Sequence, residues 1–213
     1  FMAFNCENGH LIRKQIGCTK EYCSECGKKW GLIHQRRYFR GSGKVGYIAS
    51  IKGAIGYLVL EIPEEFEKTI TKKGLSTLQN YITKWMKSEK YSHGVSVWHW
   101  CGNDGKTFTP HLNILFPEKF LEVEIINKIR NAWSKEVKKI MLKKIFSVWK
   151  TRMKKEGKKN LCTVNYSYAE GRKVYHKWKY NCRPTWRIFS EEIKDKVFNF
   201  RNIRWWGDFV NKA

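Results

Sequence analysis

The 213-residue sequence contains neither long apolar runs nor many acidic side chains. Its apolar stretches are short and interrupted by charge, which excludes a membrane-spanning helix. The opening residues, FMAFNCENGH, lack the basic start and the apolar core of a signal peptide, so we expect a cytoplasmic protein. Internal repeats and low-complexity segments are also absent, and a hydrophobic content of 42% is typical of a globular chain.

The scarcity of acidic residues leaves a large positive charge. Nineteen Asp and Glu stand against 42 Lys and Arg, which gives a formal net charge of +23. A compact fold with this charge repels itself unless a polyanion binds it, and nucleic acid is the usual partner. Lysine enrichment in an AT-rich genome is the alternative, but it seldom leaves so large an imbalance. The basic, glycine-rich residues 31–55 are expected to form a loop or linker. Its arginines, Arg36, Arg37 and Arg40, are either phosphate contacts or ordinary solvated side chains.

Seven cysteines, an odd number, argue against a disulfide framework. Four of them lie within the first 26 residues, and Cys23-x2-Cys26 has the spacing with which two thiolates grip one Zn²⁺. Cys18 is the expected third ligand. Cys6 and His10 compete for the fourth place, and Cys6 is preferred because a thiolate binds zinc more tightly. The segment has no apolar periodicity of its own, so a structural zinc site is predicted to fold it.

Apolar periodicity after this segment predicts strands interspersed with helices. Strands are expected at residues 56–62, 95–101, 110–117 and 161–168. Helices are expected at residues 64–90, at 118–155 as one or two helices, and at 171–180. The tail, residues 198–209, alternates basic and aromatic side chains, which could contact phosphates and stack on unpaired bases.

The stretch PHLNILFP at residues 110–117 places two possible metal ligands on one face of a strand. Because side chains alternate across a strand, His111 and Asn113 point to the same side. A lone His-x-Asn pattern is equally typical of an ordinary amphipathic strand with two solvated side chains.

A third ligand is needed, because an amide oxygen such as that of Asn113 is a neutral and weak ligand. The turn sequence Gly102–Gly105 predicts a hairpin between the preceding strand and the His111 strand. That pairing would place His99 beside His111. Glu61, near the end of an earlier strand, is the other candidate.

The order of these motifs resembles that of a known family. A Cys-x4-Cys-x2-Cys knuckle is followed by LVLEIP at residues 58–63, PHLNIL at 110–115, YHKWKY at 175–180 and the tail Arg-x2-Arg-Trp-Trp-Gly at 201–207. This succession resembles the rolling-circle replication initiators (Rep proteins) of small plasmids and viruses, and the related transposases, in the HUH endonuclease superfamily. The resemblance covers nearly the whole chain, although each motif is short.

The resemblance implies an α+β fold. Its central antiparallel β-sheet would be HUH/ferredoxin-like, with helices packed on one face and a zinc knuckle at the N-terminus. The implied domains are a zinc-binding knuckle at residues 1–35 and a nuclease domain at residues 36–213.

The family's functional residues carry over with one departure. The resemblance puts a catalytic Mg²⁺ or Mn²⁺ at His111 and Asn113, where Asn113 stands in place of the family's usual second histidine. The nucleophile falls on Tyr180, which follows Lys179, with Tyr175 as the alternative. Lys177 or Lys179 would hold the phosphate or assist protonation. The expected DNA contacts are Lys177, Arg183, Arg201 and Arg204.

The implied activity is metal-dependent, site-specific nicking and joining of single-stranded DNA through a 5′-phosphotyrosine, which starts rolling-circle replication at an origin in a prokaryotic host cell. The chain lacks the glycine-rich phosphate loop of a helicase, so a host helicase and polymerase are expected partners. The alternatives are an HUH-type transposase and a non-catalytic, zinc-containing nucleic-acid-binding protein.

Overall fold

The computed structural model describes residues 2–5, 11–14, 43–102, 106–157, 160–182, 190–197 and 200–208. All five candidate zinc ligands lie outside these residues, as do Arg36, Arg37, Arg40 and Arg183. Within the described ranges, no helix combines the length and apolar character needed to cross a membrane.

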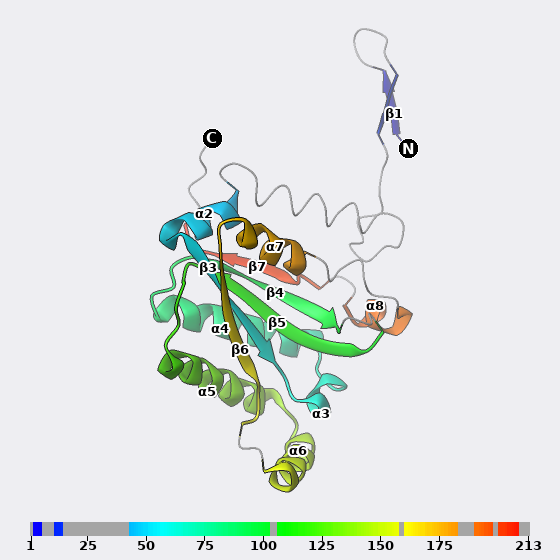
Figure 1. Ribbon diagram of the computed structural model, residues 1–213. Helices are drawn as coiled ribbons and strands as arrows, with labels where there is room; N and C mark the ends of the chain where they lie inside the picture. Colours follow the sequence, from blue (N-terminus) through cyan, green and yellow to red (C-terminus); the bar gives the residue numbers. More distant parts are fainter. Residues whose placement is uncertain are drawn as a thin grey trace.

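Seven strands and seven helices make up the described chain (Figure 1). The strands are β1 (Met2–Asn5), β2 (Leu11–Lys14), β3 (Ala54–Glu61), β4 (Gly94–Cys101), β5 (Phe108–Phe116), β6 (Val164–Glu170) and β7 (Ile203–Trp206). The helices are α2 (Lys44–Lys52), α3 (Glu64–Glu67), α4 (Lys72–Ser88), α5 (Val123–Ile140), α6 (Lys143–Glu156), α7 (Arg172–Asn181) and α8 (Glu191–Val197).

A five-stranded antiparallel sheet forms the centre of the fold, in the order β6-β3-β5-β4-β7. Strands β1 and β2 pair separately as a two-stranded antiparallel sheet. The α+β class and the central antiparallel sheet predicted from the sequence are therefore confirmed. The predicted pairing of the Trp-rich strand with the His111 strand is also confirmed, because β4 and β5 are hydrogen-bonded neighbours.

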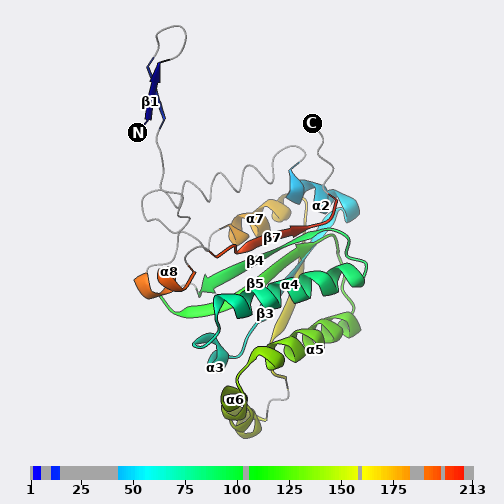
Figure 2. The same cartoon turned by 180° about the vertical axis from the view of Figure 1, so that it is seen from behind.

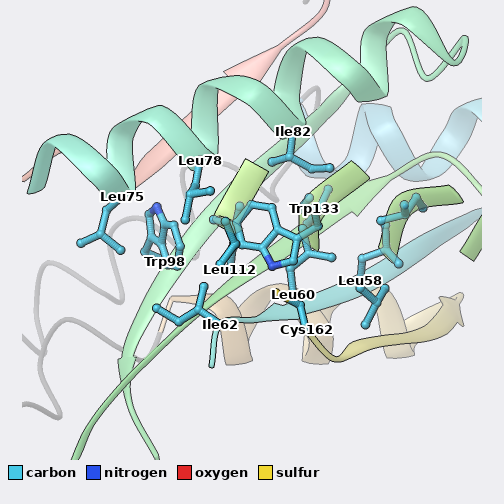
Figure 3. Close-up of a cluster of buried hydrophobic side chains, with 14 of the residues drawn as sticks. Leu58, Leu60, Ile62, Leu75, Leu78, Ile82, Trp98, Leu112, Trp133 and Cys162 are labelled. Carbon is cyan, nitrogen blue, oxygen red and sulfur yellow. The ribbon is translucent and has the colours of Figure 1, made fainter. Parts of the chain in front are cut away.

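One face of the sheet packs against α4 and α5. Leu75, Leu78 and Ile82 of α4 recur at helical spacing and lie on Trp98 of β4 (Figure 3). Trp133 of α5 is fully buried in the same cluster, and its indole N–H donates to the backbone oxygen at the end of β3 over 2.8 Å. Burying an aromatic side chain of this size contributes about 2–3 kcal/mol. This face is the main core.

The opposite face is covered by α2 and α7 (Figures 1 and 2). Val45 and Ile48 of α2 and Val174 and Trp178 of α7 belong to one buried cluster with the sheet residues Ile55, Tyr57, Val95, Val97 and Leu115. The prediction that helices pack on one face only is therefore wrong. Below, this side is called the α7 face.

Two further expectations are corrected by the helices. Residues 44–55 were expected in a loop or linker, but they form α2 and the start of β3. The single helix expected at residues 64–90 is divided into α3 and α4, because Thr71 caps α4 with a side-chain oxygen that accepts from the backbone N–H of Gly74. The long helical region after residue 117 does contain two helices, α5 and α6.

Strand β7 completes the sheet beside β4 and is fastened to α4. The buried amide nitrogen of Gln79 donates to the backbone oxygens of Ser96 and Asn202, at 3.2 and 3.0 Å. The Arg204 guanidinium, expected to contact DNA, also donates to Ser76 and Asn80 on α4. Arg204 thus holds two structural elements together.

Candidate active site

Strand register brings three of the expected ligands into one row. Across the three central strands, His111 of β5 pairs with His99 of β4 on one side and with Glu61 of β3 on the other. Directly opposed side chains on one face of a sheet have their Cβ atoms about 5 Å apart. The row lies where β3 and β4 end and β5 begins.

The two histidine rings are each oriented by a backbone carbonyl. His111 Nδ1 donates to the backbone oxygen of Thr109 over 2.9 Å. His99 hydrogen-bonds the backbone of Asn181 at the end of α7, and its buried Nε2 has no partner among the described residues. A backbone carbonyl on Nδ1 is the arrangement that leaves Nε2 with an available lone pair for a proton or a metal ion.

Both imidazoles favour the neutral form. Burial lowers the pKa of His99 well below its usual 6.5, and the neighbouring His111 lowers it further. Burial also lowers the pKa of His111, although the Thr109 carbonyl and the charge of Glu61 act in the opposite direction. The pair therefore presents uncharged nitrogens at neutral pH, which is the state that binds a cation or accepts a proton.

Helix α7 places Tyr180 against His99 of this pair. The ring centroids of Tyr180 and His99 are 5.2 Å apart, and those of His99 and His111 are 5.1 Å apart. Tyr180 is 38% exposed, so a ligand from solvent can reach it. The alternative nucleophile, Tyr175, is five residues earlier and points about 140° away around the helix, where it contacts His176.

Asn113 is engaged inside the fold. Its side chain is fully buried, and its oxygen accepts a hydrogen bond from the hydroxyl of Tyr57. Burial, and then the proximity of Tyr180, raise the pKa of Tyr57, so that its hydroxyl remains a protonated donor. The oxygen expected to bind a cation is thus already bonded, and His99 with His111 is the better pair of ligands.

The site offers two imidazoles that could bind a metal ion rather than a complete set of ligands. Among the described residues, no group of three or more His, Cys, Asp and Glu side chains is arranged to hold a metal ion. Glu61 is close enough to His111 to influence its pKa. A cation at the histidine pair would therefore draw its remaining ligands from solvent, from a bound phosphate or from Glu61.

Basic residues are distributed unevenly around the tyrosine. Lys177, one turn before Tyr180, donates to the Ser167 hydroxyl over 3.2 Å and lies 4.4 Å from the centroid of the Tyr57 ring. Partial burial lowers the pKa of Lys177. Lys179 and Arg201 are exposed.

Two contributors, Tyr57 and Ser167, were not identified from the sequence. Tyr57 shares the strand parity of Glu61 and therefore its face, which was the one available signal. Ser167 lies opposite Tyr57 on β6. Its role depends on Lys177 reaching across from α7, which no pattern along the sequence reveals.

The chain was also compared with known proteins. No protein-family model matches it, and neither a curated protein nor a solved structure matches it.

Proposed function

We propose that the protein is a metal-dependent endonuclease and strand transferase that nicks and rejoins single-stranded DNA through Tyr180, as the initiator of rolling-circle replication of a small plasmid or virus. The observation that carries this proposal is the contact of an accessible tyrosine with His99, which in turn contacts His111 on the adjacent strand, both histidines favouring the neutral form. The net charge of +23 supports a nucleic-acid substrate.

The chemistry assigned to Tyr180 is a transesterification. A free tyrosine hydroxyl is a weak nucleophile because its pKa is about 10. In the proposed step the Tyr180 oxygen attacks the scissile phosphorus, a new Tyr–O–P bond forms and the P–O3′ bond breaks. The hydroxyl proton passes to solvent water, and water returns a proton to the departing 3′-oxygen, because the imidazole nitrogens are assigned to the cation. The phosphoester energy is kept in the 5′-phosphotyrosine, so the reverse attack by a 3′-hydroxyl rejoins the strand.

Two further groups support this chemistry. Lys177 lies on the Tyr180 side of α7 and would contribute positive charge near the attacked phosphate. A divalent cation, Mg²⁺ or Mn²⁺, bound by the Nε2 atoms of His99 and His111 would polarise the phosphate. A structural Zn²⁺ at the cysteine-rich N-terminal segment remains part of the proposal.

Two alternatives use the same residues. The same nicking chemistry would serve an HUH-type transposase. A non-catalytic nucleic-acid-binding protein is favoured by one observation, namely that the described residues hold no three-ligand metal group.

Adduct formation separates these classes. The protein is incubated with a labelled single-stranded origin hairpin and Mn²⁺, and a denaturant-resistant protein–DNA adduct is sought. We expect an adduct with the wild type and with Tyr175→Phe, and none with Tyr180→Phe. An adduct that persists in Tyr180→Phe would reject Tyr180 as the nucleophile.

The histidine pair is tested in the same assay. Either His99→Gln or His111→Gln should reduce the adduct yield by at least tenfold, whereas His176→Gln on the exposed side of α7 is the matched control. If neither substitution in the pair changes the yield, the pair has no part in the reaction. If no substrate and no metal ever produce an adduct, the non-catalytic alternative stands.

A further inference from the structure

Helix α6 carries an exposed row of lysines, none of which belongs to the candidate active site. Its exposed lysines are Lys143, Lys144, Lys150, Lys154 and Lys155. The helical angle of about 100° per residue places Lys143, Lys150 and Lys154 within about 40° of one another, along about 16 Å of the axis. Figures 1 and 2 show α6 at the end of the molecule away from α2 and α7.

The acidic residues near α6 are gathered on its other side. Arg152 binds Glu64 and Glu65 of α3 over 2.8 Å each, and it lies 3.9 Å from Glu156. Arg152 is turned about 160–200° from the three aligned lysines. Among the described residues, no ion pair involves a lysine of the row.

This arrangement is unfavourable within the chain itself. Lys143 and Lys144 occupy the first turn of α6, where the helix dipole disfavours cations and where no acidic residue compensates. Lys150 and Lys154 are four residues apart, a spacing at which like charges repel. A polyanion lying along the row would relieve both effects.

Three features identify the kind of polyanion. The apolar side of α6, with Trp149 and Met153, is buried in the protein, so α6 cannot insert into a membrane surface. The exposed residues of α6 include Ser147, Thr151 and Val148 but no aromatic ring on which an unpaired base could stack, and the neighbouring Phe146 is half-buried between Trp149 and Lys138. Over the length of the row, duplex DNA carries roughly ten phosphate charges.

We infer that the α6 lysine row (Lys143, Lys150 and Lys154, flanked by Lys144 and Lys155) binds the phosphate backbone of duplex DNA without reading its sequence. This surface is separate from Tyr180. Its binding to duplex DNA does not depend on whether Tyr180 is a nucleophile. In the proposed function it would hold a double-stranded region beside the single-stranded segment that is cut.

The test is the salt dependence of duplex binding. Fluorescence anisotropy with a labelled duplex of arbitrary sequence gives Kd over a series of salt concentrations. The triple variant Lys143→Gln/Lys150→Gln/Lys154→Gln should lower the slope of log K against log salt by about 3. The control Lys119→Gln/Lys139→Gln/Lys196→Gln removes the same charge from lysines that are ion-paired with Glu170, Glu136 and Glu192, and it should change the slope by less than one.

Other arms make the result decisive. Both triple variants should fold cooperatively like the wild type, with only small shifts of the urea midpoint: upward for the row variant, which loses like-charge repulsion, and downward for the control, which loses three surface ion pairs. Tyr180→Phe should bind the duplex as the wild type does, so failure of the proposed nicking reaction would leave this inference intact. Equal slopes for the two triple variants would overturn the inference, and an equal loss of single-stranded and duplex binding would overturn the assignment to duplex DNA.

Discussion

The buried hydrogen bond between Tyr57 and Asn113 allows a quantitative test of the role of Asn113. Asn113 is fully buried and Tyr57 is 6% exposed, so neither group can turn to water when its partner is removed. Tyr57→Phe leaves the amide oxygen of Asn113 without a donor, beside an amide nitrogen that already lacks a partner among the described residues. An unsatisfied buried polar group costs about 1–3 kcal/mol.

The two substitutions should not be additive. Asn113→Leu alone leaves the Tyr57 hydroxyl unsatisfied and should also cost about 1–3 kcal/mol. Replacing both partners by apolar groups removes the polar atoms together, so the double variant should lie within about 1 kcal/mol of the wild type. Urea denaturation followed by tryptophan fluorescence measures all four proteins. Tyr166→Phe, which removes a half-buried hydroxyl bonded to a backbone oxygen over 3.1 Å, is the control and should cost at most about 1 kcal/mol.

Two results would refute this reasoning. If the cost of the double variant equals the sum of the single costs, the two side chains do not depend on each other. If Tyr57→Phe keeps the Mn²⁺-dependent adduct but the double variant, folded with wild-type stability, loses it, Asn113 is a metal ligand after all. Retention of the adduct would leave the cation to His99 and His111.

Three further predictions follow from the described contacts and from the sequence. With metal removed by a chelator, the free energy of unfolding should fall as the pH drops below about 6.5. The reason is that folding lowers the pKa of His99 and His111, so the unfolded state binds protons more readily. If urea denaturation shows the same pH dependence for His99→Gln as for the wild type, this explanation is wrong. Gly94→Ala should destabilise the protein by about 1–3 kcal/mol, because a Cβ there would overlap the Trp206 ring, and an unchanged urea midpoint would show that β7 can shift. Native mass spectrometry should find one Zn²⁺ that a chelator removes, and a mass without zinc would exclude the site predicted from residues 6–26.

Much of the sheet was predictable because its signals are local. Strands β3, β4 and β5 are apolar stretches bounded by turn residues, and their bounds differ from the expected ones by a few residues. Helix α2 was missed because only Val45 and Ile48 are buried among glycines, which leaves almost no apolar periodicity. The cap at Thr71 was a readable signal that the long helical region is divided.

The site was predictable only to the level of strand pairing. The neighbouring positions of His99 and His111 follow from a hairpin, so they could be expected. The hydrogen bond between Asn113 and Tyr57 could not be expected from the sequence. Tyr57 lies on β3, which pairs with β5 although the two strands are far apart along the chain. The choice between Tyr180 and Tyr175 likewise depends on how α7 is rotated on the sheet, and this rotation is set by the burial of Val174 and Trp178.

The attachment of β7 has a consequence for the order of folding during synthesis. Strand β4, which carries His99, pairs with β5 on one side and with Ile203–Trp206 on the other. While the ribosome is still making the residues before β7, the outer edge of β4 has no strand to bond and Gln79 lacks the Asn202 oxygen. An exposed strand edge is a template for unintended pairing with other chains. The nascent protein therefore exposes this edge until β7 is released, and a chaperone that shields it should increase the yield of folded protein.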